Sequence, residues 1–271
     1  MTGRVVAKRR VQQVRSDGRR TVVDQLAAEE PMEIRVDGQS VAVTMRTPGD
    51  DFDLALGFCL TEGIVGAADL VATMRYCVDG DQHYNVVDVG RREPGDVPAD
   101  LRRNLYTTSS CGICGTASIE AVRSRGGSVA DDPLVVDETV VADLPRRLRD
   151  AQRVFDRTGG LHAAGLVDPT GELVCAREDV GRHNAVDKVI GWAARDERLP
   201  LTGHILVVSG RVAFEIVQKA LVAGIPFIAA VSAPTSRAVT LAEEAGMTLA
   251  GFVRDGAMNI YTGAQRVRTA L

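Results

Sequence analysis

The feature that most constrains the fold is the alternation of short apolar runs with helical patterns between residues 161 and 253. Residues 161–167 and 172–176 are typical of a strand pair. Helical patterns lie between further apolar runs that are typical of buried strands, at residues 204–208, 225–231 and 247–253. Strands and helices that alternate in this way favour a mostly parallel sheet with helices on both faces. The carboxy-terminal half is therefore expected to have an α/β fold.

The amino-terminal half has a different pattern. Its first 46 residues alternate as strands do, and Asp37-Gly38 between two such runs is a strong hairpin signal. Asp51 is expected to cap a buried helix that runs to about Thr61, followed by two more strands. The pattern changes near residue 130, and an amphipathic helix is expected over residues 140–155. The sequence therefore predicts a β-rich domain at residues 1–130 and an α/β domain at residues 131–271.

Composition places the chain among globular proteins. It has 271 residues, 45% of them hydrophobic and 25% charged, and a net charge of −4, which gives no support to nucleic-acid binding. The first 20 residues are locally basic, and the simplest interpretation is a solvated edge strand. No apolar run is long enough to span a membrane, and the first residues do not resemble a signal peptide. We therefore expect a cytoplasmic protein with no membrane partner.

The five cysteines also favour a reducing compartment. Their number is odd and they are scattered along the chain. Cys59, Cys77 and Cys175 stand in apolar surroundings and are expected to be buried small side chains. Cys111 and Cys114 differ because hydroxyl residues and glycines flank them, and residues 116–122 behind them are compatible with a helix. A helix start favours the thiolate form of cysteine, so this loop is expected to carry sulfur chemistry.

A single Cys-x-x-Cys pair permits several chemistries. Structural zinc usually needs a second pair of ligands at similar spacing, which the isolated cysteines and four histidines do not supply locally. A zinc deaminase would place His-x-Glu before Pro-Cys-x-x-Cys, and that pattern is absent from the sequence. A thioredoxin-like exchanger would carry the pair early in a small domain. A persulfide carrier, in which one thiolate accepts sulfur and the second helps to release it, is the remaining interpretation.

Polar residues gather in four loops of the carboxy-terminal half, after successive strands. In an α/β sheet these loops share one rim, where ligands bind. Arginines and helix starts suit phosphates, so an anionic, phosphorylated ligand is expected, although the hydroxyl residues are equally explained as helix caps. The candidates are Asp179, Arg182, His183, Ser209, Arg211, Ser232, Thr235, Ser236, Arg237, Arg254 and Asp255. No P-loop or Rossmann glycine pattern is present in the sequence, which disfavours a generic nucleotide hydrolase or dehydrogenase.

Several motifs, in order from about residue 30 to residue 262, resemble the formate dehydrogenase accessory sulfurtransferases. The most specific is Glu178-Asp179-Val180-Gly181-Arg182-His183-Asn184-Ala185-Val186-Asp187-Lys188. The cysteine loop at residues 109–115 and Thr158-Gly159-Gly160-Leu161-His162-Ala163-Ala164 also match. Ser209-Gly210-Arg211, residues 233–236, residues 252–254 and residues 259–262 complete the resemblance.

The resemblance implies a sulfur carrier that serves formate dehydrogenase. Such a carrier accepts sulfur from a cysteine desulfurase and passes it to the molybdenum or tungsten bis-guanine-dinucleotide pterin cofactor before the cofactor enters formate dehydrogenase. It further implies a homodimer and a carboxy-terminal three-layer α/β/α domain like the cytidine-deaminase fold without its zinc, so no structural metal is expected. The persulfide maps to Cys111, with Cys114 as its helper.

The guanine-dinucleotide segment of the family maps to Phe252, Val253, Arg254, Asp255, Gly256 and Ala257. We hypothesise that Asp179 and Asp255 accept hydrogen bonds from a guanine edge, and that His183 either orients the persulfide or caps a helix. Two alternatives stay open at this point. One is a chaperone that escorts the guanylated cofactor without sulfur chemistry, and the other is a zinc-binding module.

Overall fold

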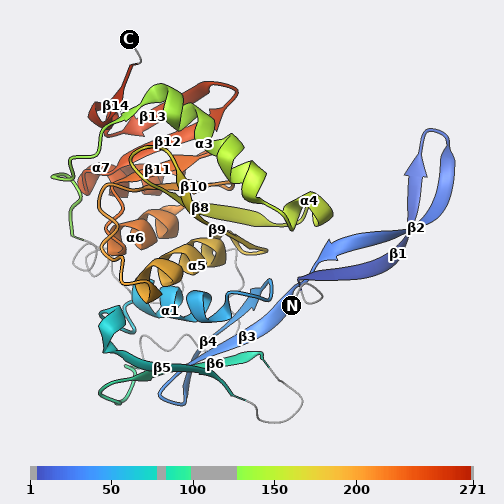
Figure 1. Ribbon diagram of the computed structural model, residues 1–271, viewed down its shortest axis with the longest axis horizontal. Coiled ribbons are helices and arrows are strands. Elements are labelled where there is room, and N and C mark those ends of the chain that lie inside the picture. The colour runs from blue at the N-terminus through green and yellow to red at the C-terminus, as the bar shows by residue number, and fades with distance from the viewer. Residues whose placement is uncertain (1–4, 78–83, 99–126, 270–271) are drawn as a thin grey trace.

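The computed structural model of the chain describes residues 5–77, 84–98 and 127–269. It opens with a two-stranded antiparallel ribbon made of β1 (Val6–Arg15) and β2 (Gly18–Ala27). No third strand of the described residues pairs with this ribbon, and it projects from the body of the molecule (Figure 1). The basic segment is therefore an isolated hairpin, which corrects the expectation of an edge strand in a larger sheet.

A four-stranded sheet and one helix form the first layers of the body. The strand order is β4-β3-β6-β5, with β3 (Glu30–Val36), β4 (Gln39–Arg46), β5 (Val71–Tyr76) and β6 (Val86–Arg91). The expected turn joins β3 to β4, with left-handed φ values of 49° at Asp37 and 77° at Gly38. Helix α1 (Asp51–Thr61) ends where expected but begins one residue earlier, because Asp50 rather than Asp51 is its N-cap. It packs Leu54 and Leu56 against Met32 and other core residues of the sheet.

The second sheet has six strands in the order β13-β12-β11-β10-β8-β9. Its strands are β8 (His162–Val167), β9 (Leu173–Asp179), β10 (Ile205–Val208), β11 (Phe227–Ala230), β12 (Thr248–Arg254) and β13 (Ala257–Thr262). Strands β10, β11 and β12 are parallel, whereas β8 is antiparallel to β9 and β10, and β13 is antiparallel to β12. The sheet is thus mixed rather than mostly parallel, because hairpins add strands at both ends of the parallel centre.

Helices cover both faces of the six-stranded sheet (Figure 1). One face packs against α5 (Arg182–Arg195), α6 (Phe214–Val222) and α7 (Ser236–Glu244) in a core that contains Leu206, Ile228 and Leu249. The other face packs against α3 (Glu138–Ala151) through Val207, Phe227 and other alternate residues. The α/β fold with three layers is confirmed. The likeness to cytidine deaminase and the boundary at residue 130 stay predictions.

Helices α1 and α5 join the two sheets at a very close crossing. A Cβ atom added to Gly57 would lie 1.9 Å from the carbonyl oxygen of Asp187, and one added to Gly191 would lie 1.8 Å from that of Asp53. Only glycine allows two helix backbones to approach so closely. The four-stranded sheet, α1, α5 and the six-stranded sheet therefore form one packed stack.

The remaining elements are short. They are η1 (Ala68–Leu70), α4 (Phe155–Thr158), η3 (Ala264–Arg266), and a small parallel pair of β7 (Val136–Asp137) with β14 (Val267–Arg268). Across the described ranges, we find no helix with the length and apolar character needed to cross a membrane.

The cysteines of the described residues differ in exposure. Cys59 and Cys175 are buried as expected, and burial raises the pKa of both thiols, that of Cys175 to about 12. Cys77 is only half-buried, which corrects the expectation for this residue, because it follows the edge strand β5. Cys111, Cys114 and the helix expected at residues 116–122 lie outside the described residues.

Candidate ligand-binding rim

The predicted candidate residues of the carboxy-terminal half lie along one edge of the six-stranded sheet. Because β10, β11 and β12 are parallel, the loops after them leave from the same edge. The end of β9 and the starts of β8 and β13 reach this edge too, since β8 and β13 run antiparallel to their neighbours. We call this edge, with the loops and helix starts on it, the rim. The prediction that four separate loops share a rim is confirmed.

Backbone hydrogen bonds join the rim loops to one another. The amide of Val212 donates to the carbonyl of Ala233 at 3.1 Å, and that of Thr235 donates to Val212 at 2.9 Å. The amide of Phe252 donates to the carbonyl of Ser232 at 3.2 Å. Thr235 also caps α7, since its hydroxyl accepts from the amide of Ala238 at 3.3 Å. The loops after β10 and β11 and the end of β12 are therefore joined into one continuous surface.

The loop after β10 carries Arg211 and lies beside Arg182 and His162. A Cβ atom at Gly210 would lie 3.3 Å from Nδ1 of His162, so glycine lets this loop approach the ring, and it would be in ordinary contact with Cβ of Arg182 at 3.7 Å. Burial, and then the charges of Arg182 and Arg211, lower the pKa of His162. A histidine kept neutral beside two guanidinium groups fits a site for an anion.

Sequence reasoning did not include His162 in the rim. It begins β8, and only the antiparallel direction of β8 brings its first residue to this edge. A signal was present in the sequence, because His162 belongs to the Gly-Gly-Leu-His motif that carried part of the family resemblance.

His183 stands at the start of α5, half-buried beside Glu215 of α6. Its Nε2 lies 3.9 Å from the nearer carboxylate oxygen of Glu215, beyond hydrogen-bond distance. Burial, and then the positive charges of Arg182 and Lys219, lower its pKa from 6.5 to about 3. His183 is therefore neutral in the folded protein at neutral pH, and the unfolded chain binds a proton there more readily.

The lowered pKa of His183 predicts that this residue makes the free energy of unfolding decrease in acid. His183 stabilises the fold fully above pH 6.5, and its contribution is lost as the pH falls from 6.5 toward 3. Between pH 7 and pH 5, wild type should lose about 2 kcal/mol more unfolding free energy than His183→Gln, which has no titrating ring. Urea denaturation at each pH measures this difference. Between pH 7 and pH 8 the two proteins should change equally, and equal losses down to pH 5 would contradict the assignment.

The turn between β12 and β13 carries the segment predicted to bind the guanine dinucleotide. Asp255 and Gly256 have φ values of 53° and 77°, typical of a two-residue hairpin turn. Phe252 also has a positive φ, 52°, which is unusual for a bulky residue, and its ring is exposed. The guanidinium carbon of Arg254 lies 5.8 Å from the centre of that ring. The turn therefore presents an exposed aromatic ring and a cation together.

A hollow of about 420 Å³ lies against this turn. It is lined by Phe252, Arg254, Asp255, Ala257, Met258 and Asn259. Arg211 and Arg237 are also exposed on the rim. Val253, in contrast, is fully buried in the core below α3, so its side chain does not contribute to this surface.

Asp179 does not offer a carboxylate to a guanine edge, and that hypothesis is corrected. The residue is fully buried. One oxygen accepts from the amide of Gly181 at 2.8 Å and from the side-chain amide of Asn184 at 3.0 Å. The other accepts from the amide of Thr47 at 3.1 Å and lies 2.8 Å from Nζ of Lys188. Asp179 instead holds the start of α5 against the end of β4.

The rest of the most specific motif is also largely structural. Glu178 accepts hydrogen bonds from the amides of Val154 and Phe155 at 2.9 and 2.8 Å, and so fixes the start of α4. Asn184 donates to the carbonyl of Met45 at 2.8 Å. Ser209 likewise has a structural partner, because its hydroxyl accepts from the amide of Ala163 at 2.9 Å. These contacts leave Arg182 and His183 as the motif residues that border the rim.

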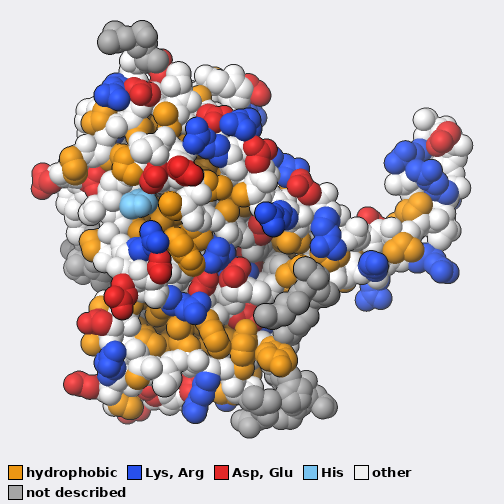
Figure 2. All heavy atoms as spheres, in the orientation of Figure 1, with side chains coloured by type: hydrophobic (Ala, Val, Ile, Leu, Met, Phe, Trp, Pro, Cys, Tyr) orange, Lys and Arg blue, Asp and Glu red, His pale blue; other side chains and the backbone are white. Residues whose placement is uncertain are grey.

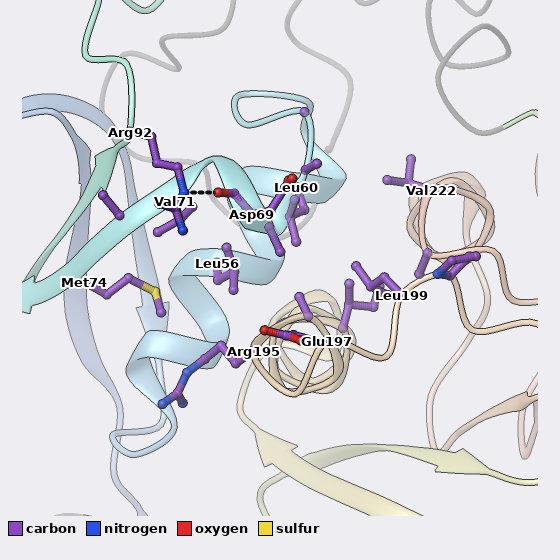
Figure 3. Close-up of a pocket in the computed structure, with 18 of the residues that line it drawn as sticks. Leu56, Leu60, Asp69, Val71, Met74, Arg92, Arg195, Glu197, Leu199 and Val222 are labelled. Carbon is purple, nitrogen blue, oxygen red and sulfur yellow. Dashed lines mark hydrogen bonds between the residues drawn. The ribbon is translucent and has the colours of Figure 1, made fainter.

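A larger cavity of about 860 Å³ lies elsewhere, between β5, α1 and the carboxyl ends of α5 and α6 (Figure 3). Leu56, Val71, Met74 and Leu199 contribute much of its apolar lining. The rim borders the amino end of α5, which is 14 residues and therefore about 21 Å long. We place the candidate site at the rim because its arginines and the Phe252–Arg254 pair of the β12–β13 turn lie there. Among the described residues, no group of three or more His, Cys, Asp or Glu side chains is arranged to hold a metal.

Comparison with known proteins identifies the family. The sequence profile of the FdhD/NarQ family matches residues 27–268. The chain belongs to the FdhD/NarQ family. This confirms the family expected from the sequence motifs. A "Sulfur carrier protein FdhD" from Streptomyces avermitilis is 55% identical, over 98% of this chain and 96% of its own. Another of that name, from Mycolicibacterium paratuberculosis, is 54% identical over 97% and 99%.

A solved structure shares the fold. The crystal structure of a protein described as a formate dehydrogenase accessory protein, from Desulfotalea psychrophila, matches with a TM-score of 0.77. The match covers 97% of this chain and all of that one, at 22% sequence identity. The two proteins therefore share the same α/β architecture.

Proposed function

We propose that this chain is a sulfur carrier that transfers sulfur to a guanylated pterin cofactor before the cofactor enters formate dehydrogenase. The observation that carries the proposal is the identity of 54–55% to relatives named sulfur carrier proteins, over nearly their whole length. The rim supports it independently, because several arginines and an exposed ring suit a ligand with phosphates and planar bases. The proposed setting is the cytoplasm, and the proposed assembly is a homodimer.

The sulfur step follows thiol exchange chemistry. The Cys111 thiolate attacks the terminal sulfur of a persulfide on a cysteine desulfurase, forms its own persulfide, and releases the donor thiolate. In delivery, Cys114 attacks the inner sulfur, which forms a Cys111–Cys114 disulfide and releases sulfide toward the molybdenum cofactor. A thiol reductant then restores both cysteines. The protein is on this account a sulfurtransferase.

The described residues would hold the cofactor as cargo. Arg182 and Arg211 would bind phosphates at one part of the rim, and Arg254 and the Phe252 ring would bind a guanine at the turn. Arg237 is the second residue of α7, which follows β11 between these two parts, so a long ligand with two phosphate-linked arms could contact all four residues. His162, neutral beside Arg182 and Arg211, could accept a hydrogen bond from the ligand or donate one to it.

The proposal predicts sulfur loading at one position. Incubation with a cysteine desulfurase and cysteine should add one sulfur atom to the intact mass, and dithiothreitol should remove it. Cys111→Ala should abolish the addition, since the nucleophile is lost. Cys175→Ala is the matched control and should load normally, because burial keeps that thiol protonated. Loading that survives Cys111→Ala would refute the assigned carrier.

The same variant separates the carrier from an escorting chaperone. A chaperone would need only the cationic rim, so Cys111→Ala would still support maturation of formate dehydrogenase. A carrier requires the thiol, and we expect maturation to fail in Cys111→Ala.

A further inference from the structure

The β1–β2 ribbon, residues 6–27, is an element without a core, and we call it the arm. Its strands pair along their whole length, from Val6 with Ala27 to Arg15 with Gly18. Val14 and Val23 are each 64% exposed, and Leu26 is 42% exposed. A two-stranded ribbon alone in water is at best marginally stable. An ordered arm with exposed valines therefore needs another surface to cover it.

The arm has two unequal faces. Residues paired across an antiparallel ribbon share a face, and the side-chain hydrogen bond of 2.9 Å from Gln12 to Thr21 agrees with this rule. One face carries three cations, the two most exposed valines and no carboxylate: Lys8, Arg10, Val14, Arg19 and Val23. The opposite face carries Arg9, Arg15 and Arg20 with Asp24, together with the apolar residues Val11, Val22 and Leu26. The first face, which we call the docking face, is the more positive one and carries the two most exposed valines.

The charge of the arm is opposite to that of the remaining chain. It contains six basic and two acidic residues, a net charge of +4. Since the whole chain has a net charge of −4, all other residues together carry −8. Figure 2 shows the basic side chains along the arm, away from the body. Within the described ranges, the arm's six basic residues form no ion pair with the chain's own carboxylates.

The root of the arm is fixed, so the arm does not fold back to satisfy these charges. The amide of Ala28 donates to the carbonyl of Val5 at 3.0 Å. Arg157 of α4 donates two hydrogen bonds, of 2.9 and 3.2 Å, to the side-chain oxygen of Gln25. Gly160 packs beside Ala27, two residues before His162. The arm therefore leaves the body close to the rim.

The length of the arm suits contact with a second molecule. Ten residues of strand extend about 33 Å, whereas a compact chain of 271 residues has a radius of gyration of about 18 Å. The arm can thus reach across the body of a neighbour. Relatives that cover 97–98% of the chain include most of the arm, although the family profile begins only at residue 27.

We propose that the docking face of the arm binds the acidic body of a second copy of this chain. Two copies related by a two-fold axis would each give an arm and receive one, so both basic surfaces would be neutralised and both pairs of valines covered. This inference deepens the homodimer of the proposed function by naming its surface. It does not depend on sulfur transfer.

The test compares two charge reversals on opposite faces of the arm in the full-length protein. Arg10→Glu with Arg19→Glu alters the docking face, and Arg15→Glu with Arg20→Glu makes the same change of net charge on the other face. Sedimentation equilibrium should show a dimer for wild type. The dissociation constant of the dimer should rise at least about tenfold for the docking-face variant and change less than about threefold for the control. Val14→Asp with Val23→Asp should also weaken the dimer. Raising the salt concentration should weaken the wild-type dimer.

Each outcome decides between the proposals. A wild-type dimer that the docking-face variants do not weaken would overturn the arm as the interface and leave the homodimer standing. A monomeric wild type would overturn both. A normal thermal unfolding curve for each variant confirms that the body has folded, and the sulfur-loading measurement reports separately on the carrier function.

Discussion

Lys219→Met is expected to lower the free energy of unfolding by about 3–5 kcal/mol, the usual cost of leaving a buried charge without its partner. Nζ of Lys219 donates to both oxygens of Asp187, at 2.8 and 2.9 Å, and to the hydroxyl of Thr61 at 2.8 Å. Lys219 and Asp187 are almost completely buried, and Lys219 also lies 3.3 Å from Glu62. Methionine keeps most of the stem and removes only the charge and its donors.

The electrostatics of the site explain the size of this effect. Burial alone would lower the pKa of Lys219, but the carboxylates of Asp187 and Glu62 outweigh it and raise the pKa. The ammonium group is therefore charged, and it holds α1, α5 and α6 together. Urea denaturation measures the loss. Arg146→Ala is the matched control, since Arg146 forms exposed ion pairs with Asp143 and Asp150, and its loss should cost far less than that of Lys219.

A double variant tests the cause. In Lys219→Met with Asp187→Leu no buried carboxylate is left without its ammonium partner, so the double variant should be less destabilised than Lys219→Met alone. A double variant that is as unstable as the sum of its single changes would show that lost packing, rather than the unpaired charge, sets the cost.

Gly191→Ala is expected to destabilise the protein by about 3 kcal/mol or more, at the upper end of the range for overpacked cores. The new methyl group would meet the carbonyl oxygen of Asp53 at 1.8 Å and the amide nitrogen of Gly57 at 2.8 Å. Both obstacles are backbone atoms, so no side-chain rotation relieves the clash, and α1 must move away from α5. The better helix propensity of alanine offsets only about 1 kcal/mol.

The control for this prediction is Gly66→Ala. An added Cβ there would meet nothing closer than a Leu70 side-chain carbon at 3.8 Å, so its stability should stay within about 0.5 kcal/mol of wild type. Thermal and urea unfolding of both variants provide the comparison. A Gly191→Ala protein as stable as the Gly66→Ala protein would mean that the two helices can separate at little cost.

The local elements of this fold could be predicted because their signals lie within a few residues of one another. The helix Asp51–Thr61 and the Asp37-Gly38 turn follow from apolar spacing and turn chemistry alone. The rim could be predicted as well, since loops after parallel strands must share an edge. The direction of β8 depends on pairing with a strand some 40 residues later, so His162 was not recognised as a rim residue.

Roles that depend on distant partners were not predictable. Asp179 ends a strand and resembles a ligand-binding residue in the sequence. The amide of Thr47, 132 residues away, nevertheless donates a hydrogen bond to one of its carboxylate oxygens. Lys188 supplies the countercharge from within the same motif. The sequence of the arm predicted strands, but the alternation of apolar and polar residues does not show whether a strand joins a larger sheet or projects from it. Conspicuous polar residues in one motif thus divide into those that hold the fold and those that border the rim.

The link between Asp179, Lys188 and Thr47 bears on how the protein could be divided. Lys188 also donates to the carbonyl of Thr47 at 2.9 Å, so a single residue at the end of β4 is held through both its amide and its carbonyl by one ion pair on the other side of residue 130. If the two segments were expressed separately, Asp179 and Lys188 would lose the backbone of Thr47 as a partner in one fragment. In the other fragment, the amide and carbonyl of Thr47 would lose the hydrogen bonds that this ion pair provides. We therefore expect that neither fragment folds on its own and that the whole chain folds as one cooperative unit.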